Sequence, residues 1–192
     1  QKHFSDATPG LDKISAQTGT THSGIVLPDG TTGRMSVDFD LISDLSRQAR
    51  LSGWSGLVQH GASTLQFEDL ARLPQAGVIE VHLATQIQNI LFDHPAFPLD
   101  LREQMKRELV KSTRSAEGDH LDTSDALSDA QRFYQARWAA WGIYKAQLWQ
   151  LPSEVISQVS DSLADWATQI FRSLKVAQRS QVLKNYYPGG QN

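Results

Sequence analysis

Three histidines of this sequence precede small residues, a combination suited to binding a metal ion or an anion. They lie in the segments 21–24 (THSG), 60–63 (HGAS) and 82–85 (HLAT). Neutral imidazoles held on separate strands are suitable zinc ligands, and a carboxylate, a third histidine or a substrate oxygen can complete the shell. A single histidine of this kind is more often a hydrogen-bonded structural residue, so the residues alone leave both interpretations open.

The small residues after the second histidine are suited to an oxyanion such as a phosphate. Gly61, Ala62 and Ser63 allow backbone N–H groups to approach a bound anion, and the Ser63 hydroxyl is a further donor. Thr85 is expected to cap a helix, whose N-terminus adds N–H donors and a favourable dipole. The alternative is a tight turn followed by an ordinary helix cap.

Alternating strands and helices are the elements that must bring these segments together. Strands are predicted at 13–17, 56–59 and 78–83, and helices at 37–51, at 67–73 and from Thr85 onwards. This rhythm predicts a parallel sheet, in either a doubly wound fold or a (β/α) barrel. The carboxyl ends of parallel strands meet at one edge, so we expect the three segments to converge there.

The chain divides into an α/β region, 1–111, and a helical extension, 112–192. Aromatic and apolar residues follow one helical face of the extension: Tyr134, Trp138, Trp141, Tyr144 and Leu148. A second amphipathic helix is predicted from Pro152 onwards. We interpret such stripes as packing surface, against the sheet region or a partner subunit. The helical extension is therefore expected to support a homo-oligomer.

Composition restricts the classes of function. The 192 residues carry 18 Lys+Arg against 21 Asp+Glu, a net charge of -3, which argues against nucleic-acid and anionic-membrane partners. Cysteine is absent, which excludes a thiolate nucleophile and Cys-ligated metal sites. No apolar run approaches the ~18 residues of a membrane span, and no signal pattern opens the chain. We expect a cytoplasmic protein.

Together the segments 19–24 (GTTHSG), 58–63 (VQHGAS) and 78–85 (VIEVHLAT) resemble the last three strand-end motifs of class II fructose-bisphosphate aldolases. These are zinc-dependent (β/α)8 lyases of glycolysis and carbohydrate metabolism. The resemblance covers residues 13–93. It implies that His22 and His60 bind Zn²⁺ or another divalent metal. It also implies a sugar phosphate bound among the following residues: Ser23, Gly24, Gly61, Ser63 and Thr85.

Two departures from the family pattern qualify this implication. His82 and Ala84 replace an asparagine that stabilises the enediolate and an aspartate that contacts substrate. His82 can still donate a hydrogen bond to a developing oxyanion, so we treat it as the candidate catalytic residue. The family's third metal histidine and its acid/base aspartate belong to earlier strands, and no segment here matches them.

The length fits a partial barrel. A closed (β/α)8 barrel needs ~250 residues, whereas about three strands are predicted here, and the chain starts at Gln1 without a methionine. We expect the C-terminal part of a TIM barrel followed by the helical extension. The expected function is a zinc-dependent aldolase acting on a ketose phosphate such as fructose bisphosphate. It would need the missing N-terminal barrel half and would be inactive alone. The alternative is a non-catalytic sugar-phosphate-binding or assembly module.

Overall fold

The computed structural model describes residues 12–20, 24–117 and 127–179. Its strands are β1 (Lys13–Ala16), β2 (Ile25–Val26), β3 (Thr32–Gly33), β4 (Gly56–Gln59) and β5 (Val78–Val81). The helices of the first half are α1 (Phe39–Leu51), α2 (Phe67–Arg72), α3 (Thr85–Phe92) and α4 (Leu99–Glu117). Those of the second half are α5 (Asp129–Ala136), the 3-10 turn η2 (Arg137–Ala139), α6 (Ala140–Ile143), α7 (Lys145–Trp149) and α8 (Ser153–Ser173).

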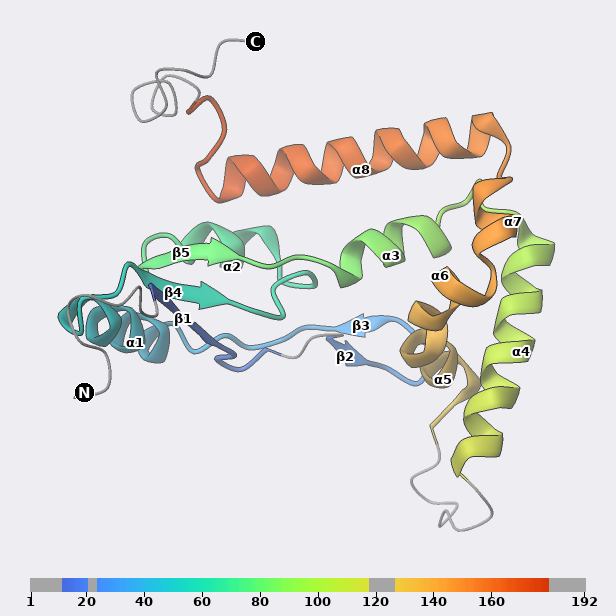
Figure 1. The fold of residues 1–192 in the computed structure, drawn as a ribbon, viewed down its shortest axis with the longest axis horizontal. Coiled ribbons are helices and arrows are strands. Elements are labelled where there is room, and N and C mark those ends of the chain that lie inside the picture. The colour runs from blue at the N-terminus through green and yellow to red at the C-terminus, as the bar shows by residue number, and fades with distance from the viewer. Residues whose placement is uncertain (1–11, 21–23, 118–126, 180–192) are drawn as a thin grey trace.

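The predicted parallel sheet is confirmed, and the fold is mixed α/β. β1, β4 and β5 pair in parallel in that order, while β2 and β3 form a separate antiparallel pair (Figure 1). The three parallel strands lie within a residue or two of their predicted positions. α1 lies between β1 and β4, and α2 lies between β4 and β5, because parallel neighbours require a crossover connection.

One irregularity in the pairing of β4 with β5 determines from which face of the sheet the later side chains of β5 project. Leu57 pairs with Val78, but the next residue, Val58, pairs with Glu80, so Ile79 has no partner on β4. Such an extra residue is a β-bulge, which is uncommon between parallel strands and often lies next to a functional site. Because residues paired across strands project from the same face, the bulge moves Glu80 to the face of Val58.

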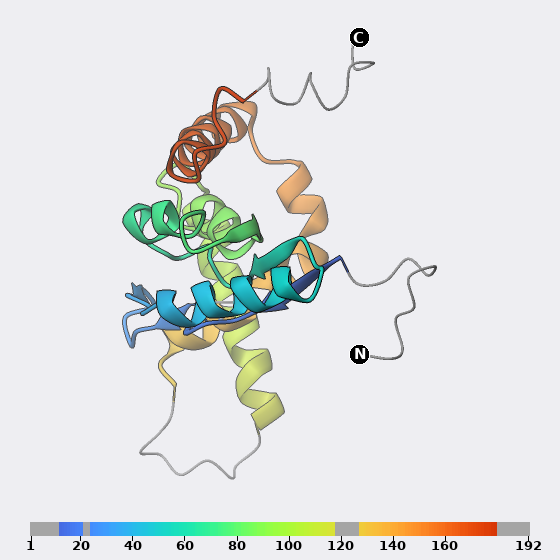
Figure 2. The ribbon, with the colours of Figure 1, turned by 90° about the vertical axis from the view of Figure 1, so that its left-hand side faces the viewer.

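The other face of the sheet packs against helices. Leu57 and Val78 form the first core with Ile42 of α1, Leu70 of α2 and Ile170 of α8. All five are under a tenth exposed. α8 runs alongside α2 and α3, so the last described helix returns to the sheet region (Figures 1 and 2). The two predicted regions therefore share a core, and the boundary predicted at 111/112 falls inside α4.

A second core holds the remaining helices together at the end of the molecule opposite the sheet (Figure 1). Its centre is Tyr144, which is 2% exposed and donates a hydrogen bond of 2.5 Å from its hydroxyl to Glu108. Burial and this carboxylate raise the pKa of Tyr144 to about 12. The same hydrogen bond is the main reason that the pKa of Glu108 lies below its ordinary value.

The single aromatic face predicted over 134–148 is wrong. The chain breaks there into α5, η2, α6 and α7, so that Tyr134 and Tyr144 are buried while Trp138 is 66% exposed. Short helical pieces do not keep one 3.6-residue period, and residues spaced by three and four then diverge. No helix within the described ranges is both long and apolar enough to cross a membrane.

Two glycines provide a matched test of the loop that leads from β1 to the site. Gly19 and Gly53 both have positive φ, +85° and +82°. A Cβ at Gly19 would overlap the carbonyl oxygen of Ser36, whereas a Cβ at Gly53 meets nothing within 4 Å. We expect Gly53→Ala to lower the free energy of unfolding by about 1 kcal/mol through φ alone. Gly19→Ala should lower it by at least about 1 kcal/mol more, measured by urea unfolding. Equal losses would contradict the close approach of Ser36.

Candidate active site

Two of the predicted histidines face each other where β4 and β5 end. The rings of His60 and His82 have centroids 4.4 Å apart and are tilted by 58°. They border a depression of about 520 Å³ whose other lining residues are Gly61, Ser63, Val81, Leu83 and Ala84. The expected convergence at the carboxyl edge is thus confirmed for the loops after β4 and β5.

The loop after β1 reaches the same edge as far as it is described. Predicted site residues His22 and Ser23 lie outside the described residues. Gly24 has φ +77°, and a Cβ there would lie 2.8 Å from the Thr64 hydroxyl oxygen. The backbone at Gly24 therefore lies against the loop that follows His60.

The loop 60–63 is buried and internally braced. Gly61 turns the chain with φ +69°, Ala62 is fully buried in the first core, and Ser63 is 7% exposed. The Ser63 hydroxyl oxygen accepts a 2.7 Å hydrogen bond from the backbone N–H of Ala84. Its own O–H can still donate toward the depression. The site therefore keeps a hydroxyl donor, while the Ala84 N–H is already engaged.

The predicted capping role of Thr85 is wrong. Ala84 precedes α3 in the N-cap position without a side-chain cap, and Thr85 is the first helical residue. Thr85 nevertheless lies at the start of α3, directly after the lining residue Ala84. The N-terminus of α3 thus lies at the depression, as expected for a helix that follows β5 directly.

A buried polar ladder supports His60 from behind. Gln59 is fully buried; its Oε1 accepts from the Thr18 hydroxyl at 3.0 Å, and its Nε2 donates to the His60 carbonyl at 2.7 Å. The Thr20 hydroxyl donates to the same carbonyl at 2.8 Å. Buried polar groups are tolerated when they are hydrogen-bonded in this way. The signal in the sequence is a glutamine at the end of an otherwise apolar strand.

A chain of charged residues reaches His82 across the open face of the sheet. Glu80 Oε1 lies 2.6 Å from His82 Nε2, and Glu80 Oε2 accepts from the Lys13 ammonium. The side chains of Lys13, Glu80 and His82 are 43%, 36% and 50% exposed. Lys13 first, and His82 second, hold the pKa of the Glu80 carboxyl below its ordinary value. The sequence did not predict the contact of Lys13 with Glu80, because these two residues are 67 positions apart.

The described residues do not by themselves fit a metal ion. Within 12–20, 24–117 and 127–179, no group of three or more His, Cys, Asp or Glu side chains is placed to hold one. Of the two predicted ligands, His60 alone lies in those ranges. A catalytic zinc site usually has three protein ligands. Within the described residues, His60 alone therefore does not make a catalytic zinc site.

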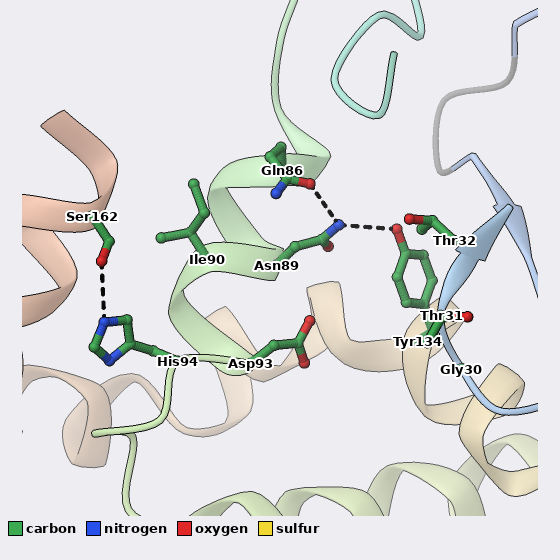
Figure 3. Close-up of a pocket in the computed structure, with 10 residues that line it drawn as sticks. All are labelled: Gly30, Thr31, Thr32, Gln86, Asn89, Ile90, Asp93, His94, Tyr134 and Ser162. Carbon is green, nitrogen blue, oxygen red and sulfur yellow. Dashed lines mark hydrogen bonds between the residues drawn. The ribbon is translucent and has the colours of Figure 1, made fainter. Parts of the chain in front are cut away.

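A second polar cluster lies between α3, α5 and α8 and was not predicted. Figure 3 shows a pocket of about 420 Å³ in which Asn89 Nδ2 donates to Gln86 and, at 3.3 Å, to the Tyr134 hydroxyl. On its far side His94 Nδ1 accepts from the Ala96 N–H, so that Nε2 donates to Ser162 at 3.2 Å. The polar side chains of this pocket are hydrogen-bonded to one another. We interpret the cluster as a structural junction between the helices.

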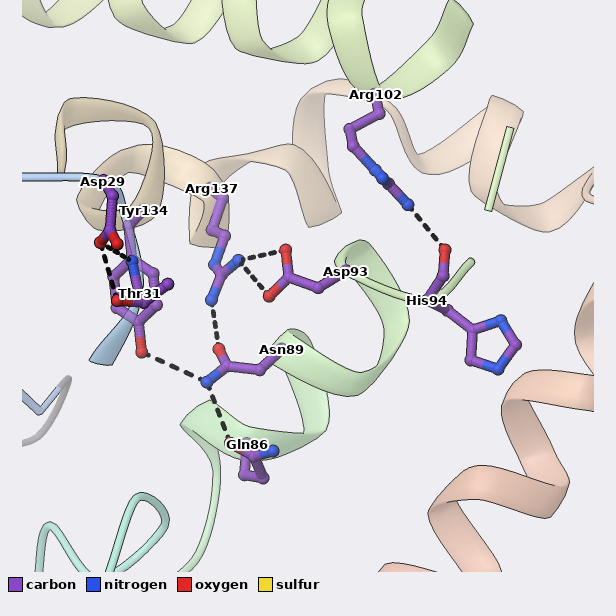
Figure 4. A network of polar contacts seen from close by, with 9 residues as sticks. All are labelled: Asp29, Thr31, Gln86, Asn89, Asp93, His94, Arg102, Tyr134 and Arg137. Carbon is purple, nitrogen blue, oxygen red and sulfur yellow. Dashed lines mark hydrogen bonds and ion pairs between the residues drawn. The ribbon is translucent and has the colours of Figure 1, made fainter. Parts of the chain in front are cut away.

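Arg137 is the centre of this junction. Its side chain is 3% exposed, and Nη1 contacts both oxygens of Asp93 at 3.1 Å while Nη2 donates to Asn89 (Figure 4). The guanidinium also lies 4.0 Å from the centre of the Tyr134 ring. These contacts join the end of α3 to the helices of the second half.

Comparison with protein-family models, with curated proteins and with solved structures finds no match to this chain.

The Glu80 carboxyl provides a pH test of the charged chain. A lowered pKa means that the ion pair with Lys13 is present above the ordinary pKa of glutamate and is lost as the pH falls through the lowered value. We expect Lys13→Met to raise the pKa of Glu80 more than His82→Gln does. Carboxyl ¹³C titration by NMR measures both values. Glu108, whose partners are Tyr144 and Gln104, is the internal control and should not change.

Removing Asp93 and removing Arg137, its buried partner, should have unequal effects. Asp93→Ala leaves a buried guanidinium without its carboxylate, and we expect a loss of about 3 kcal/mol in unfolding free energy. Arg137→Met leaves Asp93, 60% exposed, in water and unpairs only Asn89, for a loss of about 1 kcal/mol. Arg47→Met, at an exposed pair with Asp44, should change stability by less than about 0.5 kcal/mol. Urea unfolding of the three variants checks this order, and a larger loss for Arg137→Met would contradict it.

Proposed function

We propose that this chain carries the phosphate-binding loops and part of the metal site of a zinc-dependent aldolase that acts on a ketose phosphate such as fructose bisphosphate. The observation that carries the proposal is the contact of His60 with His82 beside the Ser63 hydroxyl, at the carboxyl edge of a parallel sheet. Residues from two successive strand ends meet there, as the aldolase resemblance implies.

The sheet supports a partial barrel over a doubly wound fold. β1, β4 and β5 are neighbours in sequence order, and the helices between them pack on one face. The opposite face carries Lys13 and Ser15, which are exposed, and Glu80, which is half-buried, and no described helix is packed on them. In a doubly wound sheet both faces are covered by helices, whereas in a barrel the second face is interior.

The loop after β4 supports recognition of an anion. Its positive-φ glycine, its buried alanine and the hydroxyl of Ser63 form a narrow turn beside the first turn of α3. Backbone N–H groups near a helix N-terminus attract phosphate oxygens. In the proposal this loop and the start of α3 hold the phosphate, which places the carbon chain of the substrate along the two imidazoles.

A second candidate function is non-catalytic assembly or sugar-phosphate binding. The observation that favours it is the exposure of large apolar side chains on the helical half, with Trp138 at 66% and Trp149 at 78%. Exposed tryptophans are typical of protein interfaces. In this case the helical extension would join copies of the chain, and the loops after the strands would bind phosphate without turnover.

Metal binding by His60 tests the proposal directly. We expect the isolated chain to bind zinc weakly and His60→Ala to weaken that binding at least about 10-fold, measured by competition with a metal-sensitive dye. His94→Ala removes an imidazole at the other polar cluster and is the matched control. Unchanged zinc affinity in His60→Ala would contradict the ligand assignment.

Turnover by the chain alone tests whether its site is partial, since neither candidate function expects cleavage by this chain. The proposal expects no measurable cleavage of fructose bisphosphate by the metal-loaded 192-residue chain, because this chain supplies only part of the metal site. Cleavage by that chain would overturn the partial site. If Trp149→Ala abolishes self-association while zinc affinity is unchanged, the association and the metal chemistry are separate properties.

A further inference from the structure

His82 is held through one ring nitrogen by residues that the proposed function does not use. Its Nε2 lies 2.6 Å from Glu80, and the second oxygen of that carboxylate is held by Lys13. An ionised carboxylate only accepts hydrogen bonds, so the proton of this contact belongs to Nε2. In the neutral imidazole Nδ1 then carries the lone pair.

The bulge at Ile79 makes this arrangement possible. Without the extra residue, Glu80 would pair with Gln59 and project into the helix-covered face. With it, Val81 pairs with Gln59, and His82 follows directly opposite His60. The irregularity therefore places the carboxylate and its imidazole together on the open face.

We propose that Glu80 and Lys13 are positioning residues that orient His82 so that Nδ1 accepts a hydrogen bond from a hydroxyl group of the ligand. The inference rests on the proposed function only for the class of ligand, a ketose phosphate. The phosphate lies at the loop after β4, and the hydroxyl lies next to it along the two imidazoles. His82 is then an acceptor toward the ligand, in contrast to the donor role that the sequence suggests.

The orientation of His82 is measured without metal or ligand. Two-bond ¹H–¹⁵N correlation spectra of the wild-type chain, at a pH where the imidazole signals no longer move, should show His82 with its proton on Nε2 alone. Glu80→Gln should shift both nitrogens toward the averaged values of the urea-unfolded chain. Glu68→Gln, an exposed carboxylate on α2, is the control and should leave them unchanged. A wild-type His82 that already shows the averaged values overturns the positioning role.

Ligand binding tests the acceptor role with two probes. Inorganic phosphate carries the anion alone, and dihydroxyacetone phosphate adds a hydroxyl and a carbonyl. We expect Glu80→Gln and His82→Ala each to lower the affinity for dihydroxyacetone phosphate about 3- to 10-fold, measured by titration calorimetry. The affinity for inorganic phosphate should stay unchanged. Because Glu80 acts through His82, the double variant should lose no more than His82→Ala.

The outcomes separate this inference from the proposed function. If phosphate binds but both single variants bind dihydroxyacetone phosphate as the wild type does, the hydroxyl acceptor is overturned and the anion loop stands. If the variants lower the affinity for both probes equally, they act on the anion loop, and the acceptor role is again overturned. If the wild-type chain binds neither probe, hydroxyl recognition falls together with the proposed phosphate site, while the NMR result still decides the positioning by Glu80.

Discussion

The pairing of β4 with β5 is the constraint on which the site depends. A strand has a side-chain period of two, so a shift of one residue moves every later side chain to the other face. The unpaired Ile79 makes that shift once, after Val78 has already joined the core. The strand thereby begins with Val78 in the core and ends with Glu80 on the opposite face.

The second requirement is a stable polar interior at the same edge. Gln59 occupies a position that an apolar side chain would normally fill, and it holds the loop after β1 to the carbonyl of His60. Both the oxygen and the nitrogen of its side-chain amide are hydrogen-bonded, so burying Gln59 leaves neither atom without a partner. The backbone beneath His60 is therefore tied to two strand ends at once.

The sequence predicts the elements better than it predicts their contacts. The strands predicted at 13–17, 56–59 and 78–83 agree with β1, β4 and β5 to within two residues, and the meeting of His60 with His82 follows from the parallel arrangement. The contact of Lys13 with Glu80 cannot be predicted from the sequence, because it depends on a β-bulge that no local sequence pattern indicates.

The helical half was predicted less well for a related physical reason. Spacings of three and four indicate one face only while a helix continues. Gly142 is a local signal for the break at Tyr144, but no residue indicates the break at η2. Arg137 is likewise unremarkable in the sequence, because its burial depends on Asp93 and Asn89, which lie on another element.

The return of α8 to the sheet has a consequence for the order of folding. Ile170 is fully enclosed in the core that Leu57 and Val78 begin, with Trp166 and Leu174 packed around it. During synthesis, that core stays incomplete until α8 has left the ribosome. The strands of the sheet emerge before α8, so their packing is completed only when α8 returns to them.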